Sequence, residues 1–385
     1  MLRADIFPER WDVVPLGEAV TFLDNMRRPV TASDRVAGPY PYYGANGIQG
    51  TIDGFIFDEP LLLLAEDGGN FGNPDRDIAY IADGRYWVNN HAHVIRPKAS
   101  LDLRFLYRVL QRYDVTPFIK GATRAKLTKG DASLIPIPLP PLPEQKRIAA
   151  ILDKADAIRR KRQQAIQLAD NFLRAVFLEM FGDPVTNPKG WDEYVLNEIS
   201  DIRSGVTKGK AVKPEESVTR PYMRVANVQD GYLDLADVQR ITVSKRDAEK
   251  CLLLEGDILL TEGGDPDKLG RGHVWCGEVE GCLHQNHIFS VRVNDKERVR
   301  PAFLSAIISS PRGKRYFLKV GKQTTGIATI NKSVLSEFVP FVPPVALQDK
   351  YLAVVKRIGA VKQSLAEGDV ELFSSLSQKA FSGQL

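Results

Sequence analysis

The sequence of 385 residues contains little cysteine, little histidine and no long apolar run. Its three cysteines, Cys251, Cys276 and Cys282, all lie in the second half and are too few for the disulfide framework of a secreted scaffold. No uninterrupted apolar run approaches membrane-spanning length. A signal peptide's apolar stretch is also missing from the charged first residues, MLRADIFPERWD. We therefore expect a cytoplasmic protein with no membrane contact.

A strong excess of charge of one sign is absent as well. Lys and Arg together number 52 and Asp and Glu number 48, so the formal net charge is +4. This balance permits binding to an acidic polymer without requiring it, and any basic surface must be local. An apolar content of 43% in 385 residues is enough to give each of two domains its own core.

Motifs of a self-contained DNA-modifying or DNA-cutting enzyme are missing. We find no Asn/Asp-Pro-Pro-aromatic motif of an amino-methyltransferase and no glycine-rich cofactor loop between strand and helix. Residues 205–210, GVTKGK, fall one residue short of a phosphate-binding P-loop. Residues 265–268, DPDK, resemble part of a nuclease motif but are spaced too tightly for separate metal-binding carboxylates. We expect no catalytic residue in this chain.

The sequence does contain an internal repeat, which determines architecture before any single residue is interpreted. Trp11-Asp12 recurs about 180 residues later as Trp191-Asp192. Further matches are YYGAN (42–46) with YMRVAN (222–227), LLLLAEDGG (61–69) with DILLTEGG (257–264), NNHAHVIR (89–96) with QNHIFSVR (285–292), and LTKGDASLIPIPLPPLPEQ (127–145) with INKSVLSEFVPFVPPVALQ (330–348). The repeat predicts domains at 1–142 and 182–343, each followed by a helix, at 143–181 and 344–385.

Within each domain the pattern predicts an α+β fold. Short apolar runs bounded by Gly, Asp and Asn predict strands at 61–65, 257–261 and 288–293. Helical patches at 103–111 and 302–309 lie between such runs. We find no regular alternation of strand and helix of the kind that builds a doubly wound sheet.

Each of the two long helices follows a proline-rich exit, at 136–143 and 340–344. Apolar residues then recur at heptad spacing, which predicts a coiled-coil seam. The first helix carries the rows Ile148, Ala155, Ala169, Val176 and Ile151, Ile158, Ala165, Phe172; the second carries Tyr351, Ile358, Leu365, Leu372 with Val354 and Val361. Arg162 interrupts the first seam, and we expect a kink near Gly368-Asp369 in the second.

Periodicity alone leaves open whether these helices are a spacer or ordinary core of one large domain. The duplication favours a spacer, about 55 Å long from Pro143 to Phe181 at about 1.5 Å per residue. Two equivalent helices pair most naturally about a pseudo-two-fold axis, which makes them antiparallel. Residues 159–162, RRKR, are more typical of a solvated face than of a DNA-facing or partner-facing patch.

Several cations and polar residues are candidates for DNA contact. The glycine-containing loop with Arg203, Thr207, Lys208 and Lys210 could follow a phosphate backbone, although it could also be a solvated loop. Specificity should lie where the two copies differ. This argument adds Arg27, Arg28, Arg124 and Lys126 in the first domain, and Arg271, Lys314, Arg315, Lys319, Lys322, Gln323, Thr324 and Thr325 in the second.

Two residue pairs at matching places in the copies have two interpretations. Arg224 with Asn227, and Tyr42 with Asn46, could read base edges in the major groove. A scaffold role is at least as consistent for Asn46 and Asn227, because domains that read different sequences would share a turn rather than a base contact.

Histidine and cysteine gather at five positions of the second half: His273, Cys276, Cys282, His284 and His287. Their spacing matches no common zinc motif, and the equivalent stretch around His91 has no cysteine. We expect no metal ion here. We expect His91 and His287 to be structural, satisfied by neighbouring backbone groups.

Three motifs together resemble the specificity subunits of type I restriction-modification systems. They are WDVVPLGE (11–18), IPIPLPPLPEQKRIAAILDKADAI (135–158) and FGDPVTNPKGW (181–191), and with the repeat the resemblance covers nearly the whole chain. In the second proline exit, residues 345–347 read VAL where the first copy has LPE (142–144), which weakens the prediction of the second helix's length.

The resemblance implies a non-catalytic chain that binds double-stranded DNA, two methyltransferase subunits and, through or beside them, restriction subunits with motor and nuclease activity. Each domain would read half of a bipartite site, and the helix pair would fix the spacer between the halves. The partners would methylate adenine N6 or cut, and they would carry S-adenosylmethionine, ATP and Mg²⁺. A protein-interaction adaptor without DNA specificity is the alternative, and it would show no steep salt dependence of DNA binding.

Overall fold

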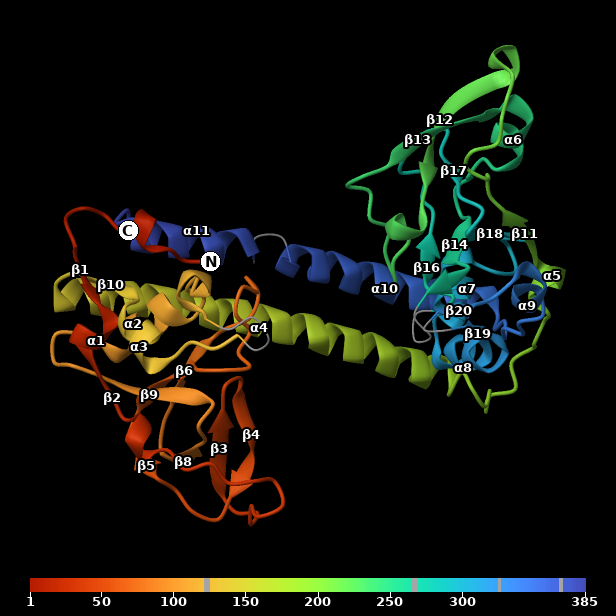
Figure 1. Ribbon diagram of the computed structural model, residues 1–385. Coiled ribbons are helices and arrows are strands. Elements are labelled where there is room, and N and C mark those ends of the chain that lie inside the picture. The colour runs from red at the N-terminus through yellow and green to blue at the C-terminus, as the bar shows by residue number, and fades with distance from the viewer. Residues whose placement is uncertain (121–124, 265–268, 325–326, 367–369) are drawn as a thin grey trace. The chain divides into compact units, whose positions relative to one another are not determined.

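The computed structural model describes residues 1–120, 125–264, 269–324, 327–366 and 370–385 (Figure 1). The chain divides into two compact units, unit 1 with Met1–Ala165 and Leu365–Leu385, and unit 2 with Ile166–Ser364. Each unit combines one of the repeated domains with adjoining parts of the long helices. Helices and sheets are mixed in both, which confirms the α+β fold class. No helix in the described part of the chain is long and apolar enough to cross a bilayer.

A four-stranded antiparallel sheet forms the centre of unit 1. Its order is β2 (Val20–Phe22), β9 (Ala92–Pro97), β6 (Leu61–Ala65) and β7 (Ala79–Ala82). The continuous apolar run of β6 is buried on both faces, as the sequence predicts for a central strand. Leu62 and Leu64 pack with the helix α2 (Leu103–Leu110), whereas Leu61 and Leu63 face a second sheet.

That second sheet is ordered β4 (Gly47–Ile52), β3 (Tyr40–Gly44), β8 (Arg85–Val88) and β5 (Phe57–Asp58). Unit 1 also contains β1 (Asp12–Pro15) paired with β10 (Pro136–Leu139), the helices α1 (Leu16–Ala19) and α3 (Lys129–Ser133), and the 3-10 turns η1 (Ala4–Ile6), η2 (Asp24–Met26) and η3 (Thr116–Phe118).

Unit 2 repeats this plan. Its central sheet is ordered β11 (Ser200–Ser204), β18 (Ile288–Val293), β14 (Ile258–Thr261) and β16 (Gly272–Val274), and α7 (Pro301–Ile308) packs on the face that carries Ile258 and Leu260. A second sheet, β13 (Gln239–Ser244), β12 (Ser217–Met223) and β17 (Leu283–His284), matches the second sheet of unit 1. The strands and helices predicted in both domains are thus confirmed, with ends shifted by at most one residue.

The remaining elements of unit 2 frame these sheets. A small sheet runs β15 (Gly263–Gly264), β20 (Ile327–Thr329), β19 (Lys322–Thr324). The helices are α5 (Leu196–Ile199), α6 (Lys245–Lys250), α8 (Pro311–Val320) and α9 (Lys332–Ser336), with the 3-10 turns η4 (Pro214–Glu216) and η5 (Val225–Asn227).

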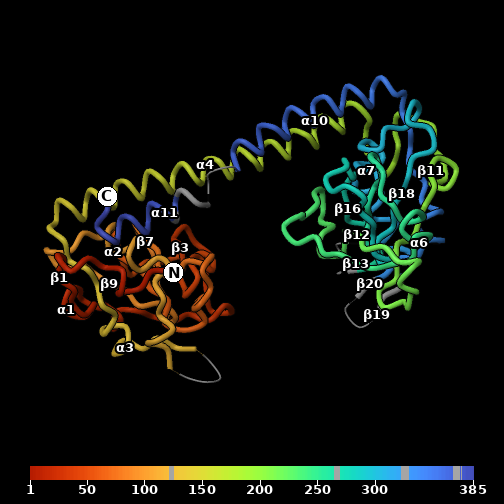
Figure 2. The backbone as a smooth tube through the Cα atoms, turned by 90° about the horizontal axis from the view of Figure 1, so that it is seen from above, coloured from red at the N-terminus to blue at the C-terminus, as the bar shows by residue number. Residues whose placement is uncertain are grey.

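The long helices are α4 (Leu142–Phe181), α10 (Val345–Ala366) and α11 (Val370–Phe381), traced in Figure 2. In unit 1, Arg147 donates to the backbone oxygen of Leu385, and the Arg159 guanidinium lies over the Phe373 ring. In unit 2, Phe177 contacts Tyr351, and Asp170 pairs with Lys362. Residue numbers rise along α4 as they fall along its partner, so the pairing is antiparallel within each unit.

One row of the predicted seam is less buried than its neighbour. The row through Ile148, Ala155 and Val176 is buried or half-buried, but the second buried row begins at Leu152, one residue later than predicted. Leu152 is 1% exposed, whereas Ile158 and Phe172 are 41% and 50% exposed. At 3.6 residues per turn, positions three and four residues away both flank the first row. Because apolar residues occupy both flanks of this helix, periodicity could not choose between them.

The other predicted packing residues have mixed outcomes. Tyr351 is buried, and Ile151, Ile358 and Leu365 are half-buried. The kink predicted at Gly368-Asp369 and the side chain of Leu372 lie outside the described part of the chain.

Candidate nucleic-acid interface

In each unit, connecting loops gather at one end of the central sheet. β6 ends at Ala65, which pairs with Ala92, the first residue of β9. In the same way β14 ends at Thr261, which pairs with Ile288, the first residue of β18. The connections that follow β2 and β11 leave at this same end of the sheet. We call it the loop end of each unit.

Identical backbone bonds build the two loop ends. The amide of Glu66 donates to the carbonyl of His91, and the Glu66 carbonyl accepts from Leu127. In unit 2, Glu262 donates to His287 and accepts from Ile330. These bonds make Glu66 and Glu262 structurally equivalent.

A histidine-carboxylate pair occupies both loop ends. His91 Nδ1 lies 2.5 Å from an Asp67 carboxylate oxygen, and His287 Nδ1 lies 2.6 Å from a Glu262 carboxylate oxygen. The prediction that backbone groups satisfy these histidines is therefore wrong, because carboxylates hold the rings.

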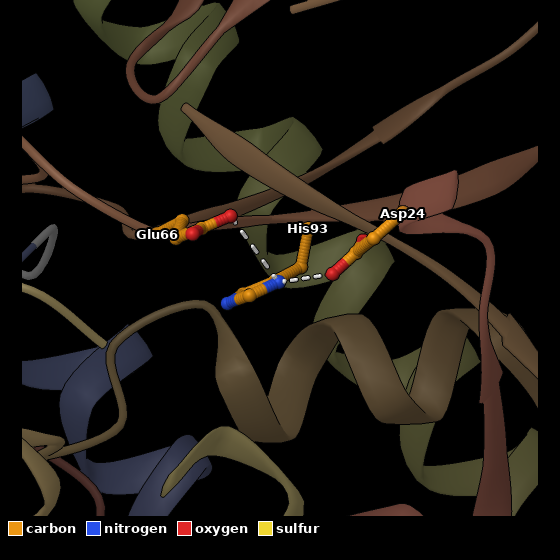
Figure 3. A group of neighbouring side chains, drawn as sticks. All are labelled: Asp24, Glu66 and His93. Carbon is orange, nitrogen blue, oxygen red and sulfur yellow. Dashed lines mark hydrogen bonds and ion pairs between the residues drawn. The ribbon is translucent and has the colours of Figure 1, made fainter. Parts of the chain in front are cut away.

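The loop end of unit 1 also contains a buried ion network, drawn in part in Figure 3. The fully buried His93 places Nδ1 at 2.7 Å from Asp24 and Nε2 at 2.8 Å from the carbonyl of Leu127. Both ring nitrogens therefore lie within hydrogen-bond distance of oxygen atoms. Burial alone would raise the pKa of Asp24, but the hydrogen bond and charge of His93 and the charge of Arg27 lower it below its ordinary value.

The same group has the spacing of a metal site. Ligand atoms of Asp24, Glu66 and His93 lie within 4.8 Å of one another, the one such group in the described part of the chain. However, the Arg27 guanidinium donates to Glu66 at 2.6 Å and lies 3.4 Å from Asp24. Protein cations already balance both carboxylates, so this arrangement is an ion network rather than a vacant metal centre.

The histidines and cysteines of unit 2 do not assemble a site. Cys276 is exposed, whereas Cys282 and His284 are buried. Burial raises the pKa of Cys282 to about 12 and lowers the pKa of His284 to about 4. Thiol burial disfavours the thiolate that a zinc ion would need.

The candidate cations of the first domain differ in their ion pairs and in the exposure of their side chains. Arg27 is 12% exposed and bound to the Asp24-Glu66 network. Lys126 lies 3.2 Å from Glu66 but is half-exposed. Arg28 is exposed. Arg124 lies outside the described residues.

In the second domain, Thr207, Lys208 and Lys210 are exposed on the connection that follows β11. Lys210 pairs with Asp247 at 3.0 Å, and the half-buried Arg203 pairs with Asp201. The side chains of the β19 residues are not described, and Thr325 lies outside the described residues. Three further candidates, Lys314, Arg315 and Lys319, are exposed on α8.

Arg271 lies beside the end of β14, where its carbonyl accepts from Thr261. It is half-buried, and its Nε is buried without a hydrogen-bond partner.

The two residue pairs that could either read bases or support a turn are hydrogen-bonded to neighbouring loop backbone. Buried Asn227 donates to the carbonyls of Asp234 and Asp237 and accepts from the Arg224 amide, while Arg224 pairs with the Asp237 carboxylate. Asn46 donates to Gly68 and accepts from Asn70. Buried Tyr42 bonds through its hydroxyl to Val30. These contacts favour the scaffold interpretation, although Arg224 remains partly exposed.

Candidates chosen separately in the two copies fall on equivalent segments. Arg27 and Arg28 follow β2 as Thr207 to Lys210 follow β11. Lys126 forms backbone β-bridges with Lys120 and with Asp67. In unit 2, the strand β20 pairs in the same way with β19 and with β15. Lys120, which we did not predict, is largely exposed at the place that Lys322 occupies in unit 2. Extending the repeat through residues 120–126 would have identified it.

The fold and its loop ends therefore define a class of protein: two copies of an α+β domain, each carrying cations at one end of its sheet and each joined to antiparallel long helices. Comparison with known proteins gives the family. A model of the type I restriction modification DNA specificity domain matches residues 8–168. The EcoKI specificity subunit of Escherichia coli K12 is 25% identical over 100% of this chain and 91% of its own.

Other relatives agree. The StySPI specificity subunit of Salmonella potsdam is 23% identical over 98% of this chain and 90% of its own. A putative specificity subunit of Haemophilus influenzae, S.HindORF215P, is 43% identical, but over only 37% of each chain. The crystal structure of a type I S subunit from M. genitalium has the same fold, with a TM-score of 0.62 at 16% identity over 97% of this chain and 96% of that one.

The matched specificity domain and the relatives aligned along the whole chain support a type I restriction-modification specificity subunit of the HsdS family. Specificity subunits of type I systems are the non-catalytic members of complexes whose catalysis resides on other subunits.

Proposed function

We propose that the chain recognises a bipartite double-stranded DNA site, with one half-site read by the loop end of each unit. The observation that carries this proposal is the duplication of the loop end. Equivalent backbone bonds support equivalent loops in both units, and both sets of loops present exposed cations. Shared cations suit phosphate contacts, which position a protein on DNA, while differing side chains suit base contacts, which specify the sequence.

Catalysis is assigned to partners. We propose that two methyltransferase subunits bind the chain and methylate adenine N6 in the recognised site, and that restriction subunits join them to cut unmethylated DNA. S-adenosylmethionine, ATP and Mg²⁺ would be bound by those partners. The complex would work in the cytoplasm, where it meets DNA.

A groove in unit 1 is a candidate contact for a partner subunit. It lies between α4 and α11, has a volume of about 210 Å³, and is lined by Ile151, Ile158, Phe373 and Leu376 with Lys154 and Arg162 among others. Ile158 is exposed although it is apolar. Because exposed apolar residues that line a groove are typical of an interface, we propose this groove as a methyltransferase contact.

A salt titration tests DNA recognition against the adaptor alternative. The complex with its methyltransferase subunit would be titrated with double-stranded DNA over a range of salt concentrations. Phosphate contacts release counterions, so the logarithm of the affinity should fall linearly and steeply with the logarithm of the salt concentration. An absence of binding, or binding without that slope, would favour the adaptor.

A further inference from the structure

Gln145 and Gln348 occupy matching places in the first turns of α4 and α10. Each is the glutamine that ends the repeated proline-rich exit. Although glutamine is a polar residue, their side chains are 1% and 0% exposed. A buried amide is costly unless its donors and acceptor are all used, so such burial in both copies needs an explanation.

In unit 1 the amide of Gln145 joins three segments. Its Oε1 accepts from the backbone amide of Asp102 at 2.8 Å, and Asp102 is the N-cap of α2. Its Nε2 donates to the carbonyl of Ser100 at 3.0 Å and to the carbonyl of Pro140 at 2.8 Å. The first turn of α4 is thereby tied to the β9–α2 connection and to the proline exit.

In unit 2 the amide of Gln348 makes the same three bonds. Its Oε1 accepts from the backbone amide of Arg300, the N-cap of α7, at 2.9 Å. Its Nε2 donates to the carbonyls of Arg298 at 3.0 Å and Pro343 at 2.8 Å. We call these two arrangements the glutamine clasps.

Only a primary amide supplies one acceptor and two donors at this place. The surrounding contacts are not shared. In unit 1, Arg108 of α2 pairs with Asp153 and Asp156 of α4, whereas in unit 2 Arg300 pairs with Asp349 of α10. Ion pairs therefore differ between the copies, while the clasp is kept in both. A feature kept in domains with different surroundings serves a task that both domains perform.

We infer that Gln145 and Gln348 are positioning residues that fix the angle between each recognition domain and its long helix, and thereby restrict the spacer length between the two half-sites. This inference rests on the proposed function. Each clasp holds the N-cap of the helix that packs on the central sheet, so a change of angle at the clasp would carry the whole loop end with it. Neither glutamine needs to contact DNA.

The test compares Gln145→Met, Gln348→Met and the double variant, since Met keeps the length of the side chain but makes none of the three bonds. Each variant would be assembled with its methyltransferase subunit. Methylation would be measured on a DNA library in which the two half-sites, known from the unaltered protein, are separated by every spacer length around the native one. Leu63→Ala is the matched control, because it weakens the core on the side of the central sheet away from α2.

The unaltered protein should methylate a narrow set of spacer lengths. Each glutamine variant should keep both half-sites but raise methylation at neighbouring lengths relative to the native length by about tenfold, which corresponds to ~1.4 kcal/mol less discrimination. The double variant should be broader than either single one. A narrow profile in all three variants, the same broadening in Leu63→Ala, or failure of all three variants to assemble would overturn the positioning role. Absence of any bipartite methylation by the unaltered protein would instead contradict the proposed function.

Discussion

At the scale of single residues, the cations of the loop ends fall into two groups: those that pair with buried carboxylates and those whose side chains are exposed. Arg27 pairs with both Asp24 and Glu66, so its positive charge is already balanced within the protein. Removing one member of such a buried network leaves an uncompensated charge, which costs stability. Lys208 and Arg28 are exposed at equivalent places. They are the better candidates for phosphate contact, and this assignment stays a prediction.

Lys208→Ala should weaken DNA binding by the complex and reduce the salt slope of the logarithm of affinity by about 1, because one phosphate contact is lost. The loss should be similar for all DNA sequences. Lys296→Ala is the matched control, since this exposed lysine lies beyond the opposite end of β18 and donates to the carbonyl of Glu255. Equal salt slopes for the two variants would show that Lys208 makes no phosphate contact.

His284 predicts a pH dependence of folding in unit 2. Burial holds the pKa of this histidine at about 4, below its ordinary value of 6.5, while its Nδ1 donates to the carbonyl of Cys251. The unfolded chain therefore takes up a proton at higher pH than the folded one. Stability should fall as pH drops from about 6.5 to about 4, by on the order of 3 kcal/mol from this group.

The measurement is the free energy of unfolding of unaltered protein and His284→Asn, obtained by urea titration across this pH range. Asparagine can keep the donor to Cys251 but does not titrate. The variant should lose that part of the pH dependence. Parallel curves for both proteins would show that His284 does not carry it.

At the scale of elements, the sequence identified the strands and helices of both domains because periodicity and a duplicated pattern point to the same segments. The run at 61–65 could be assigned because a strand buried on both faces is apolar throughout. The second row of α4 could not be assigned, because Ile151 and Leu152 are both apolar and tertiary packing, which places Leu152 in the core of unit 1, decides between them. The network around His93 was not predicted, because its members lie far apart in the sequence and no spacing pattern connects them.

The corrected row of α4 predicts unequal effects for two aliphatic truncations. Leu152→Ala should lower the free energy of unfolding by about 2–5 kcal/mol, because Leu152 is buried in the core of unit 1. Ile158→Ala should lower it by less than about 1 kcal/mol, because Ile158 is exposed. Ile158→Ala should nevertheless weaken binding of the methyltransferase subunit if the groove is its contact.

Urea unfolding of both variants, with a pull-down of the methyltransferase subunit, checks this prediction. A larger unfolding effect for Ile158→Ala would restore the row predicted from sequence. Unchanged methyltransferase binding would remove the groove from the interface.

At the scale of the whole molecule, the long helices are proposed to set the distance between half-sites. A four-residue insertion between Ile148 and Val176 adds about 6 Å to α4 at 1.5 Å per residue. That length corresponds to roughly two base pairs of DNA at 3.4 Å each. Both half-sites should be preserved while the spacer between them changes. Methylation of the original spacing alone would contradict a spacer role for the helix.

The most direct test of the central claim is methylome sequencing of a host that expresses this chain together with its methyltransferase subunit, compared with hosts that express either one alone. The account predicts a new bipartite N6-methyladenine motif that appears only when both are present. A stable complex that produces no such motif, or a motif produced by the methyltransferase subunit alone, would contradict the claim that this chain supplies the DNA specificity.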